Sequence, residues 1–148
     1  MKTYIIIILC FFNSSACNIS KNDKPKSGYD VNKLEGRWEL EYIISPTTPF
    51  EKLYVTNKPF IEFNVTNKKI SGINSCNHFG GELVIQDSSI DLSGPIAVTE
   101  MYCPDQAEGE MFFNNVLSKV NSWKVTDSLL FFMSRDSILM RFVKKPKA

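Results

Sequence analysis

The sequence has little of what catalytic and nucleic-acid-binding proteins use. It has one histidine, His78, so a catalytic triad or a zinc site would have to depend on that one side chain. Its 17 Lys and Arg residues against 16 Asp and Glu residues leave no basic surplus for binding phosphate backbones. It has no Gly-x-Ser-x-Gly elbow, and Gly80-Gly81 lacks the lysine and helix of a phosphate-binding loop. We therefore expect no catalytic residues, no metal, no cofactor and no nucleic-acid partner.

The chain also lacks an apolar run long enough to span a bilayer, which takes about 20 residues. Its N-terminus has Lys2, an apolar run over residues 4–12, and the small residues Ser14-Ser15-Ala16. This order is typical of a secretory signal peptide, which we assign to residues 1–16.

Cys17 follows these small residues directly, and the arrangement resembles the lipobox of bacterial lipoproteins, although Ser14 stands where leucine is usual. The resemblance implies a lipid on Cys17. A plain signal peptide with a free cysteine is the alternative. Residues 17–33 are polar and have no apolar periodicity, as in a flexible tether. We thus expect a monomer of the bacterial cell envelope that is attached through Cys17 to the outer membrane and faces the periplasm or the cell surface.

Four cysteines are present, and two of them are expected to pair. Cys10 is removed with the signal peptide and Cys17 carries the lipid, which leaves Cys76 and Cys103 in an oxidising compartment. A disulfide over 27 positions would stabilise the fold by about 3.5 kcal/mol. A reactive dithiol is the alternative, because Cys103 directly precedes a predicted helix.

Alternating apolar residues predict a mainly β domain over residues 34–144, with 145–148 as a tail. Trp38, Leu40, Tyr42 and Ile44 share one face of the first strand. The run Leu129–Met133 is continuously apolar, which indicates a strand buried on both faces or covered by a helix. Seven or eight short antiparallel strands are expected in a curved sheet or partly closed barrel. The strand segments lie near 36–44, 59–65, 69–73, 82–86, 90–92, 123–125, 129–133 and 138–143, and residues 96–99 lead to Cys103.

One segment, from about Asp105 to Lys119, has the spacing of a helix. Asp105 and Glu108 have the spacing of a capping box at its start. Glu108 and Glu110 lie two positions apart, so their side chains face different sides of the helix. We expect them to complement the positive N-terminal end of the helix dipole rather than to act as a carboxylate pair in acid-base chemistry.

The segment Ile73–Gly81 has the composition of a fixed loop, because Asn, Ser and paired Gly favour tight turns. Within it, Phe79 can pin the loop to the core. We nevertheless expect Asn77, His78 and Phe79 to form an exposed recognition set. Arg135-Asp136 is expected to be a solvated turn.

Four fragments, in order, resemble the META domain family (HslJ-like). They are Leu34–Leu40, Gly72–Gly81, Thr99–Pro104 and Glu110–Phe113 with Leu117, and they match its Leu-x-Gly-x-Trp, Cys-Asn-x-Phe, Thr-x-Met-Ala-Cys and helix patterns. Ser75 and Tyr102 depart from the pattern, since the family usually has Gly and Ala there. The resemblance implies a β-rich fold with one helix, in secreted or lipid-anchored proteins associated with envelope stress and drug tolerance.

The sequence thus predicts a non-enzymatic, lipid-anchored envelope module, related to binding or stress and with no defined chemistry, whose partner is a protein or another envelope component that the sequence does not identify. Two alternatives stay open. The first is a carrier of small hydrophobic ligands in a barrel interior, which the 11 Phe residues would permit. The second is an inhibitor of an exported protease that presents a rigid loop to the enzyme.

Overall fold

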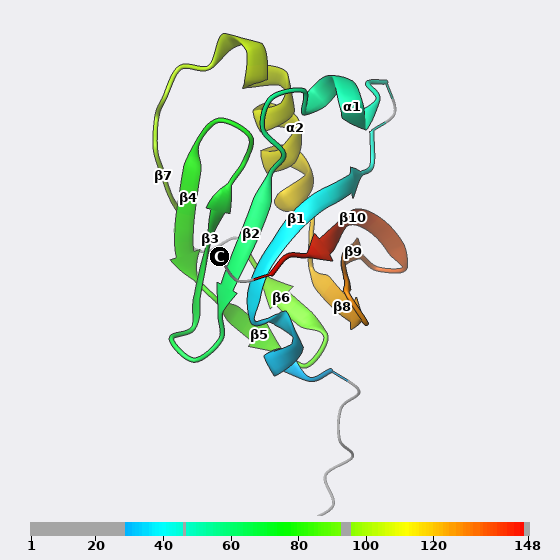
Figure 1. Ribbon diagram of the computed structural model, residues 1–148. Coiled ribbons are helices and arrows are strands. Elements are labelled where there is room, and N and C mark those ends of the chain that lie inside the picture. Colours follow the sequence, from blue (N-terminus) through cyan, green and yellow to red (C-terminus); the bar gives the residue numbers. More distant parts are fainter. Residues whose placement is uncertain (1–28, 46, 93–95, 147–148) are drawn as a thin grey trace, which may run out of the picture.

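The protein is an antiparallel sheet curled into a half-barrel with one long helix, which confirms the predicted mainly β class (Figure 1). The computed structural model describes residues 29–45, 47–92 and 96–146. The predicted signal peptide, Cys17 and most of the tether lie outside these ranges. Ten strands form one sheet in the order β5-β6-β8-β9-β10-β1-β2-β3-β4-β7, more strands than the seven or eight expected. Their bounds are β1 Gly36–Ile43, β2 Phe60–Asn64, β3 Lys69–Ile73, β4 His78–Glu82, β5 Val84–Gln86, β6 Ser89–Asp91, β7 Ala97–Val98, β8 Ser122–Thr126, β9 Leu129–Ser134 and β10 Ser137–Lys144.

The sheet curls because strands β4 and β5, which are nearly continuous in sequence, pair near opposite ends of the strand order. Strands β4 and β5 are separated only by Leu83, yet β4 pairs with β3 and β7 while β5 pairs with β6. The chain therefore crosses from one end of the strand order to the other in a single step. This link brings the two ends of the sheet together and, among the described strands, leaves β5 with a partner on one side only.

The first strand contains a bulge that changes which residues face the core. Trp38 and Leu40 are buried as predicted, but the pairing of β1 with β10 shifts between Leu40 and Tyr42. An extra residue in one strand reverses the alternation beyond it. Ile43 is buried as a result, and the prediction that Tyr42 and Ile44 share the inner face is wrong, since both are exposed.

The concave face of the sheet is filled with large side chains. Strand β9 buries Leu130 and Phe132 completely, whereas Leu129, Phe131 and Met133 on its other face are half-buried. The alternative that β9 is buried on both faces is therefore wrong, and its buried residues Leu130 and Phe132 share one core with Phe113 of the long helix. The largest fully buried side chains are Trp38, Trp123, Phe63, Phe113, Phe132, Phe142, Leu34, Leu40, Ile61, Ile70, Leu130 and Met140.

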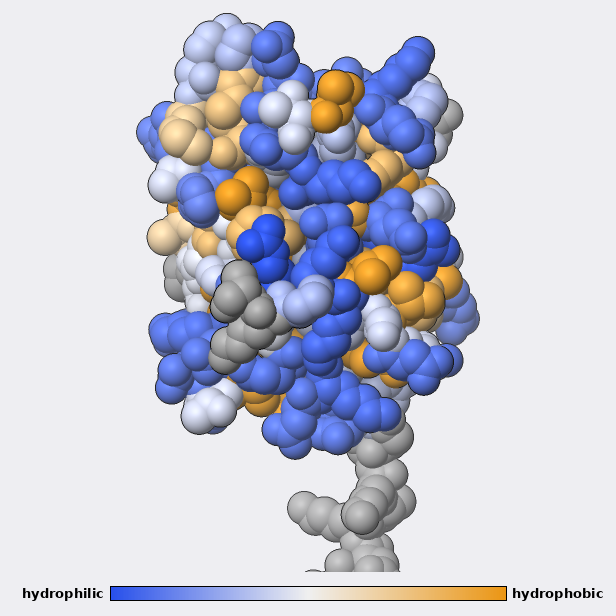
Figure 2. All heavy atoms as spheres, in the orientation of Figure 1, coloured by the Kyte–Doolittle hydropathy of each residue, from blue (hydrophilic) through white to orange (hydrophobic). Residues whose placement is uncertain are grey.

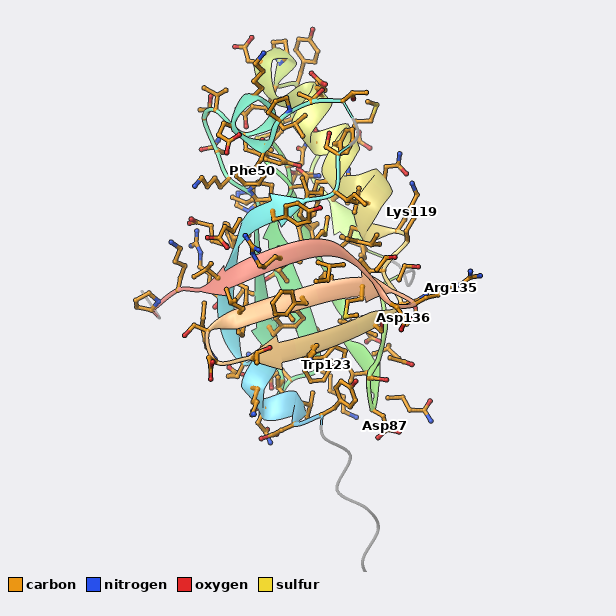
Figure 3. All side chains as sticks on the ribbon, turned by 90° about the vertical axis from the view of Figure 1, so that its right-hand side faces the viewer. Phe50, Asp87, Lys119, Trp123, Arg135 and Asp136 are labelled. Carbon is orange, nitrogen blue, oxygen red and sulfur yellow. A yellow bond between two sulfur atoms is a disulfide. The ribbon has the colours of Figure 1, made fainter. Side chains whose placement is uncertain are left out.

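Helix α2 (Ala107–Leu117) covers one end of the half-barrel, with the short helix α1 (Phe50–Leu53) at the same end (Figures 1 and 3). It buries Gly109, Phe113, Val116 and Leu117. A 3₁₀ turn, η2 (Pro104–Gln106), precedes it, so the α-helix begins two residues later than predicted. The expected capping box does not form: the helix has no side-chain cap, and the Glu108 carboxylate accepts a hydrogen bond from the Thr48 hydroxyl at 2.9 Å.

Gly109 lets the two helices approach closely. A Cβ atom there would lie 2.5 Å from the carbonyl oxygen of Leu53 and 3.0 Å from the ring of Tyr54. The Tyr54 hydroxyl donates to the carbonyl of Gly109 at 3.1 Å. Burial raises the pKa of Tyr54 well above its ordinary value.

In the described part of the chain, no helix has both the length and the apolar character needed to cross a membrane.

At the opposite end of the half-barrel lie a second 3₁₀ turn, η1 (Val31–Leu34), and the β5–β6 hairpin (Figure 1). The Trp38 indole donates to the carbonyl of Leu34 at 2.7 Å, which fixes η1 against the first strand. Arg135 and Asp136 are exposed in the β9–β10 turn, as predicted, and project from the side of the molecule in Figure 3.

Candidate functional site: a braced turn and a cleft

The segment predicted as an irregular loop is a tight turn followed by a strand. Strand β3 ends at Ile73, residues 74–77 make the turn, and His78 begins β4. The Asn74 backbone N–H donates to the Asn77 carbonyl at 3.0 Å, and the Asn74 side chain accepts from the Asn77 N–H at 2.8 Å. Ser75 lies between them with a φ of 105°, a conformation that glycine adopts more easily.

A disulfide joins this turn to the segment before the helix. Cys76 and Cys103 are bonded, with their Cα atoms 5.9 Å apart. The backbone is ordered at both cysteines. Cys76 belongs to the β3–β4 turn, and the carbonyl of Cys103 accepts a hydrogen bond from the Gln106 N–H at 3.0 Å. The pair is therefore a cross-link between the sheet and the start of the helical segment.

Asn77 holds the same segment a second time. Its side-chain oxygen accepts from the Met101 N–H at 2.7 Å and from the Thr99 hydroxyl at 2.9 Å. Its amide nitrogen donates to the Met101 carbonyl at 3.3 Å. One side chain thus binds both polar groups of the Met101 backbone, two residues before the disulfide.

Glu110 connects this turn to helix α2. Its carboxylate accepts from the Asn77 amide at 2.9 Å and from the Asn74 amide at 3.1 Å. Asn74 also donates to the side-chain oxygen of Asn114 at 3.2 Å. Glu110 therefore does more than complement the helix dipole: it accepts hydrogen bonds from the two asparagines that shape the turn. Sequence reasoning missed this role, and the only signal for it was that Asn74 and Asn77 flank a cysteine.

The expected recognition set is divided by the fold. Asn77 is 4% and Phe79 6% exposed, so the expectation that both are exposed is wrong, and His78 alone faces solvent. The Phe79 ring packs 6.0 Å from the Phe113 ring, centroid to centroid. Its ring also fills the space where a Cβ atom of Gly72 would lie, 2.6 Å away. Phe79 therefore pins β4 to the core.

What the braced segment does expose is Met101 and Tyr102. Met101 is 51% and Tyr102 90% exposed, although the backbone on either side is tied down by Asn77 and Cys103. Val98, just upstream in the edge strand β7, is exposed as well. We call residues 98–103 the braced loop. It presents apolar and aromatic side chains on a backbone with restricted freedom.

His78 lies beside the braced loop, and its backbone carbonyl accepts a hydrogen bond from the Thr99 N–H at 2.9 Å. Within the described ranges, no three His, Cys, Asp or Glu residues lie close enough together to hold a metal ion. The His78 backbone N–H donates to the Thr99 hydroxyl at 3.0 Å, which fixes the backbone of this residue while its side chain stays exposed.

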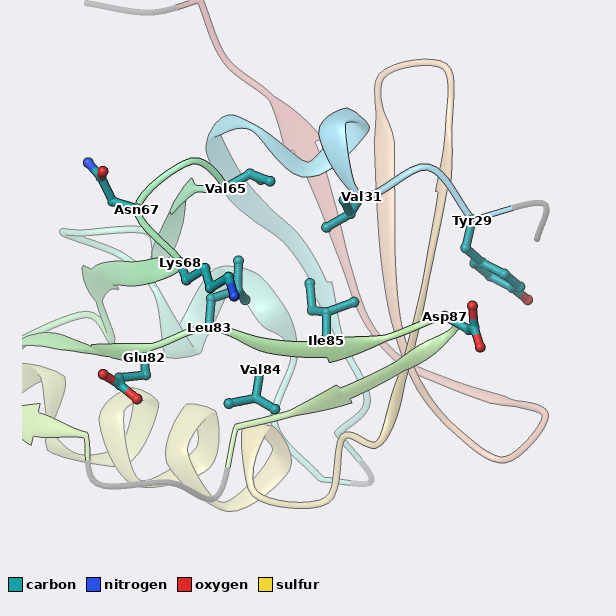
Figure 4. Close-up of a pocket in the computed structure, with 10 residues that line it drawn as sticks. All are labelled: Tyr29, Val31, Val65, Asn67, Lys68, Glu82, Leu83, Val84, Ile85 and Asp87. Atoms are coloured by element: carbon teal, nitrogen blue, oxygen red, sulfur yellow. The ribbon is translucent and has the colours of Figure 1, made fainter. Parts of the chain in front are cut away.

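A second feature is a cleft of about 680 Å³ at the end of the half-barrel away from α2 (Figure 4). It lies between η1, the β2–β3 turn and strand β5. Figure 4 shows Val31, Val65, Leu83 and Ile85 pointing into a common space, while Val84 points away from it. The complete lining is Tyr29, Val31, Val65, Asn67, Lys68, Glu82, Leu83, Val84, Ile85 and Asp87.

The family model of the META domain matches residues 31–147, almost the whole described chain. The chain belongs to the META domain family. A solved NMR structure matches with a TM-score of 0.55 and 23% sequence identity, over 78% of this chain and 95% of that one. This likeness supports the fold. No match is found among curated protein sequences.

Ser75 and Tyr102, the two residues that depart from the family pattern, occupy different environments in the structure. Ser75 occupies a positive-φ position that suits the glycine usual in the family, and its hydroxyl donates to the Asn57 carbonyl at 3.2 Å. Tyr102 replaces a small residue and is the most exposed large hydrophobic side chain of the described domain. A large aromatic side chain therefore stands on the outer surface next to the Cys76–Cys103 disulfide.

Proposed function

We propose that this META domain protein is a non-enzymatic, lipid-anchored binding module of the cell envelope, which recognises a protein partner through the braced loop. The observation that carries the proposal is the exposure of Met101 and Tyr102 on a backbone held by a disulfide and by Asn77. A loop that is already ordered loses little conformational entropy on binding. Exposed Tyr side chains are also frequent energetic centres of protein interfaces.

Tyr102 is the most exposed large hydrophobic side chain of the described residues. In the view of Figure 2, hydrophobic residues are scattered among hydrophilic ones rather than gathered in one broad patch. A partner that docks on a small, rigid aromatic loop fits this distribution better than one that needs a wide apolar face.

A photo-crosslinking residue in place of Tyr102 tests the proposal in intact cells. We expect a discrete crosslinked species that is absent when the same residue replaces Asp136 in the β9–β10 turn, which is also exposed. Unmodified wild-type protein in excess should compete the crosslink away, and the Tyr102→Ala variant should compete poorly. Equal crosslinking from both positions would refute recognition through the braced loop.

The anchor is tested separately. Cys17→Ser should move the protein from the membrane fraction to the soluble fraction, because the acyl chains supply the attachment. Retention of the variant in the membrane fraction would contradict the lipid assignment without touching the proposal for the braced loop.

Protease inhibition is the second candidate, and Tyr102 favours it. Inhibitors of this kind offer an exposed side chain on a rigid loop, and Tyr102 stands next to the Cys103 disulfide. The purified domain should then inhibit an exported protease that accepts aromatic side chains, and Tyr102→Ala should lose the inhibition while Ile138→Ala keeps it. No inhibition at micromolar concentration across a protease panel removes this candidate. The carrier hypothesis has less support, since large side chains fill the barrel interior.

A further inference from the structure

Strand β5 has a free edge that faces the cleft. In an antiparallel pair, opposite residues alternate between exchanging both backbone hydrogen bonds and exchanging none. Ile85 lies opposite Ile90, and the Ile90 N–H donates away from β5, to the carbonyl of Asn121 at 3.2 Å. Ile85 and Ile90 are therefore a pair that exchanges no hydrogen bonds. The N–H and carbonyl of Ile85 consequently point away from β6, toward the cleft.

The neighbouring residue confirms this direction. The Leu83 N–H, two residues earlier on the same side of the strand, donates to the carbonyl of Lys68 in the β2–β3 turn at 2.9 Å. Beyond that bond the β2–β3 turn ends, and the outward polar groups of Ile85 have no hydrogen-bond partner within the described ranges. The edge is thus open for the length of β5.

Side chains around the edge supply an apolar pocket whose lining includes three charged residues, Lys68, Glu82 and Asp87. The Glu82 carboxylate is paired with the Lys69 ammonium at 3.5 Å. Val31, Val65 and Ile85 face one another in the cleft (Figure 4). Lys68 and Asp87 lie on opposite sides of Ile85 in the same view, and neither has an ion-pair partner in the described part of the chain. The open stretch of backbone, from Val84 to Asp87, spans about 10 Å at ~3.4 Å per residue.

We propose that this cleft binds an extended peptide segment of a partner protein, which adds to the free edge of β5 as a further strand. Backbone donors and acceptors at Ile85 match a strand rather than an acyl chain or a compact small molecule. The side chain opposite Ile85 enters the pocket beside Val31 and Val65. Lys68 and Asp87 select a peptide with an acidic residue toward Lys68 and a basic residue toward Asp87.

This site is independent of the braced loop, which lies at the α2 end of the half-barrel (Figure 1). A segment added antiparallel to β5 runs from Asp87 toward Leu83. The basic residue therefore precedes the apolar one, and the acidic residue follows it. The central residue exchanges both hydrogen bonds with Ile85.

The test uses the mature full-length chain with Cys17→Ser and a blocked peptide, Ser-Lys-Thr-Val-Thr-Glu-Ser. Two-dimensional NMR should show shifts concentrated at Val84, Ile85 and Gln86, and the Ile85 amide should exchange more slowly with solvent in the complex. A matched peptide with Lys and Glu interchanged should bind about fivefold more weakly, because two exposed ion pairs are lost. N-methylation of the central Val should weaken binding about tenfold, since it removes the donor to the Ile85 carbonyl.

A charge-reversed protein makes the test reciprocal. Lys68→Glu combined with Asp87→Lys should prefer the interchanged peptide, with an unchanged unfolding temperature as the check on folding. The proposal is overturned if the first peptide causes no shifts in β5 at millimolar concentration, or if the N-methylated peptide binds equally well. It is also overturned if the Ile85 amide is already protected from exchange in the free protein, because the edge would then already be occupied.

Discussion

Removing the side chain of Asn77 should destabilise the protein more than its small size suggests. In the folded state this side chain is buried and makes three short hydrogen bonds, to the Met101 N–H, the Thr99 hydroxyl and the Glu110 carboxylate, at 2.7, 2.9 and 2.9 Å. At about 1 kcal/mol for each bond, Asn77→Ala should lower the free energy of unfolding by about 3 kcal/mol. The largest part comes from the Met101 N–H, which loses its partner beside the disulfide.

Urea unfolding followed by tryptophan fluorescence measures this change, because Trp38 and Trp123 are both buried. With an m-value of about 1.5 to 2 kcal/mol/M, the midpoint should fall by roughly 1.5 to 2 M. His78→Ala is the matched control, since its exposed side chain should matter by less than about 0.5 kcal/mol. A loss below about 1 kcal/mol for Asn77→Ala, or a loss equal to that of the control, would refute the view that Asn77 holds the braced loop.

Three further predictions concern other contacts. Replacing Cys76 and Cys103 together by Ala should lower the free energy of unfolding by about 3.5 kcal/mol in the same assay, from a separation of 27 positions, and an unchanged value would contradict the brace. Gly109→Ala should lower the unfolding temperature despite alanine's higher helix propensity, because the new Cβ would lie 2.5 Å from a backbone oxygen of α1; a higher temperature would show that the helices can separate freely. Burial raises the pKa of Tyr54 in the folded state, so the stability that the neutral hydroxyl contributes is complete below the ordinary tyrosine pKa of about 10 and is lost as the pH rises above it. The free energy of unfolding, measured from pH 8 to 11, should show this loss in the wild type and a smaller loss in Tyr54→Phe.

Local patterns predicted the hairpins well. The β2–β3, β5–β6 and β9–β10 hairpins lie where alternating apolar residues flank short polar turns. Such hairpins depend on residues that are close in sequence, so the sequence pattern contains most of the information that defines them. The same is true of the helical stripe, whose buried residues include Phe113, Val116 and Leu117.

The errors occurred where distant segments decide the outcome. The bulge after Leu40 depends on the pairing of β1 with β10, about 100 positions away, and it turned Tyr42 outward. Asn77 and Phe79 were expected on the surface as part of a recognition set, but residues of helix α2 contact both of them. Glu110 accepts a hydrogen bond from the buried Asn77 amide, and the Phe113 ring packs against Phe79. No local sequence pattern connects these two helix residues to the turn.

The sequence by itself determined the family, the mainly β class and the pairing of Cys76 with Cys103, because these rest on ordered motifs, on periodicity and on cysteine count. Only the tertiary structure decided which side chains of residues 74–79 face solvent, since burial depends on what packs against each strand. It also decided that β5 has a free edge beside an apolar cleft, because an edge exists only once the order of strands in the sheet is known.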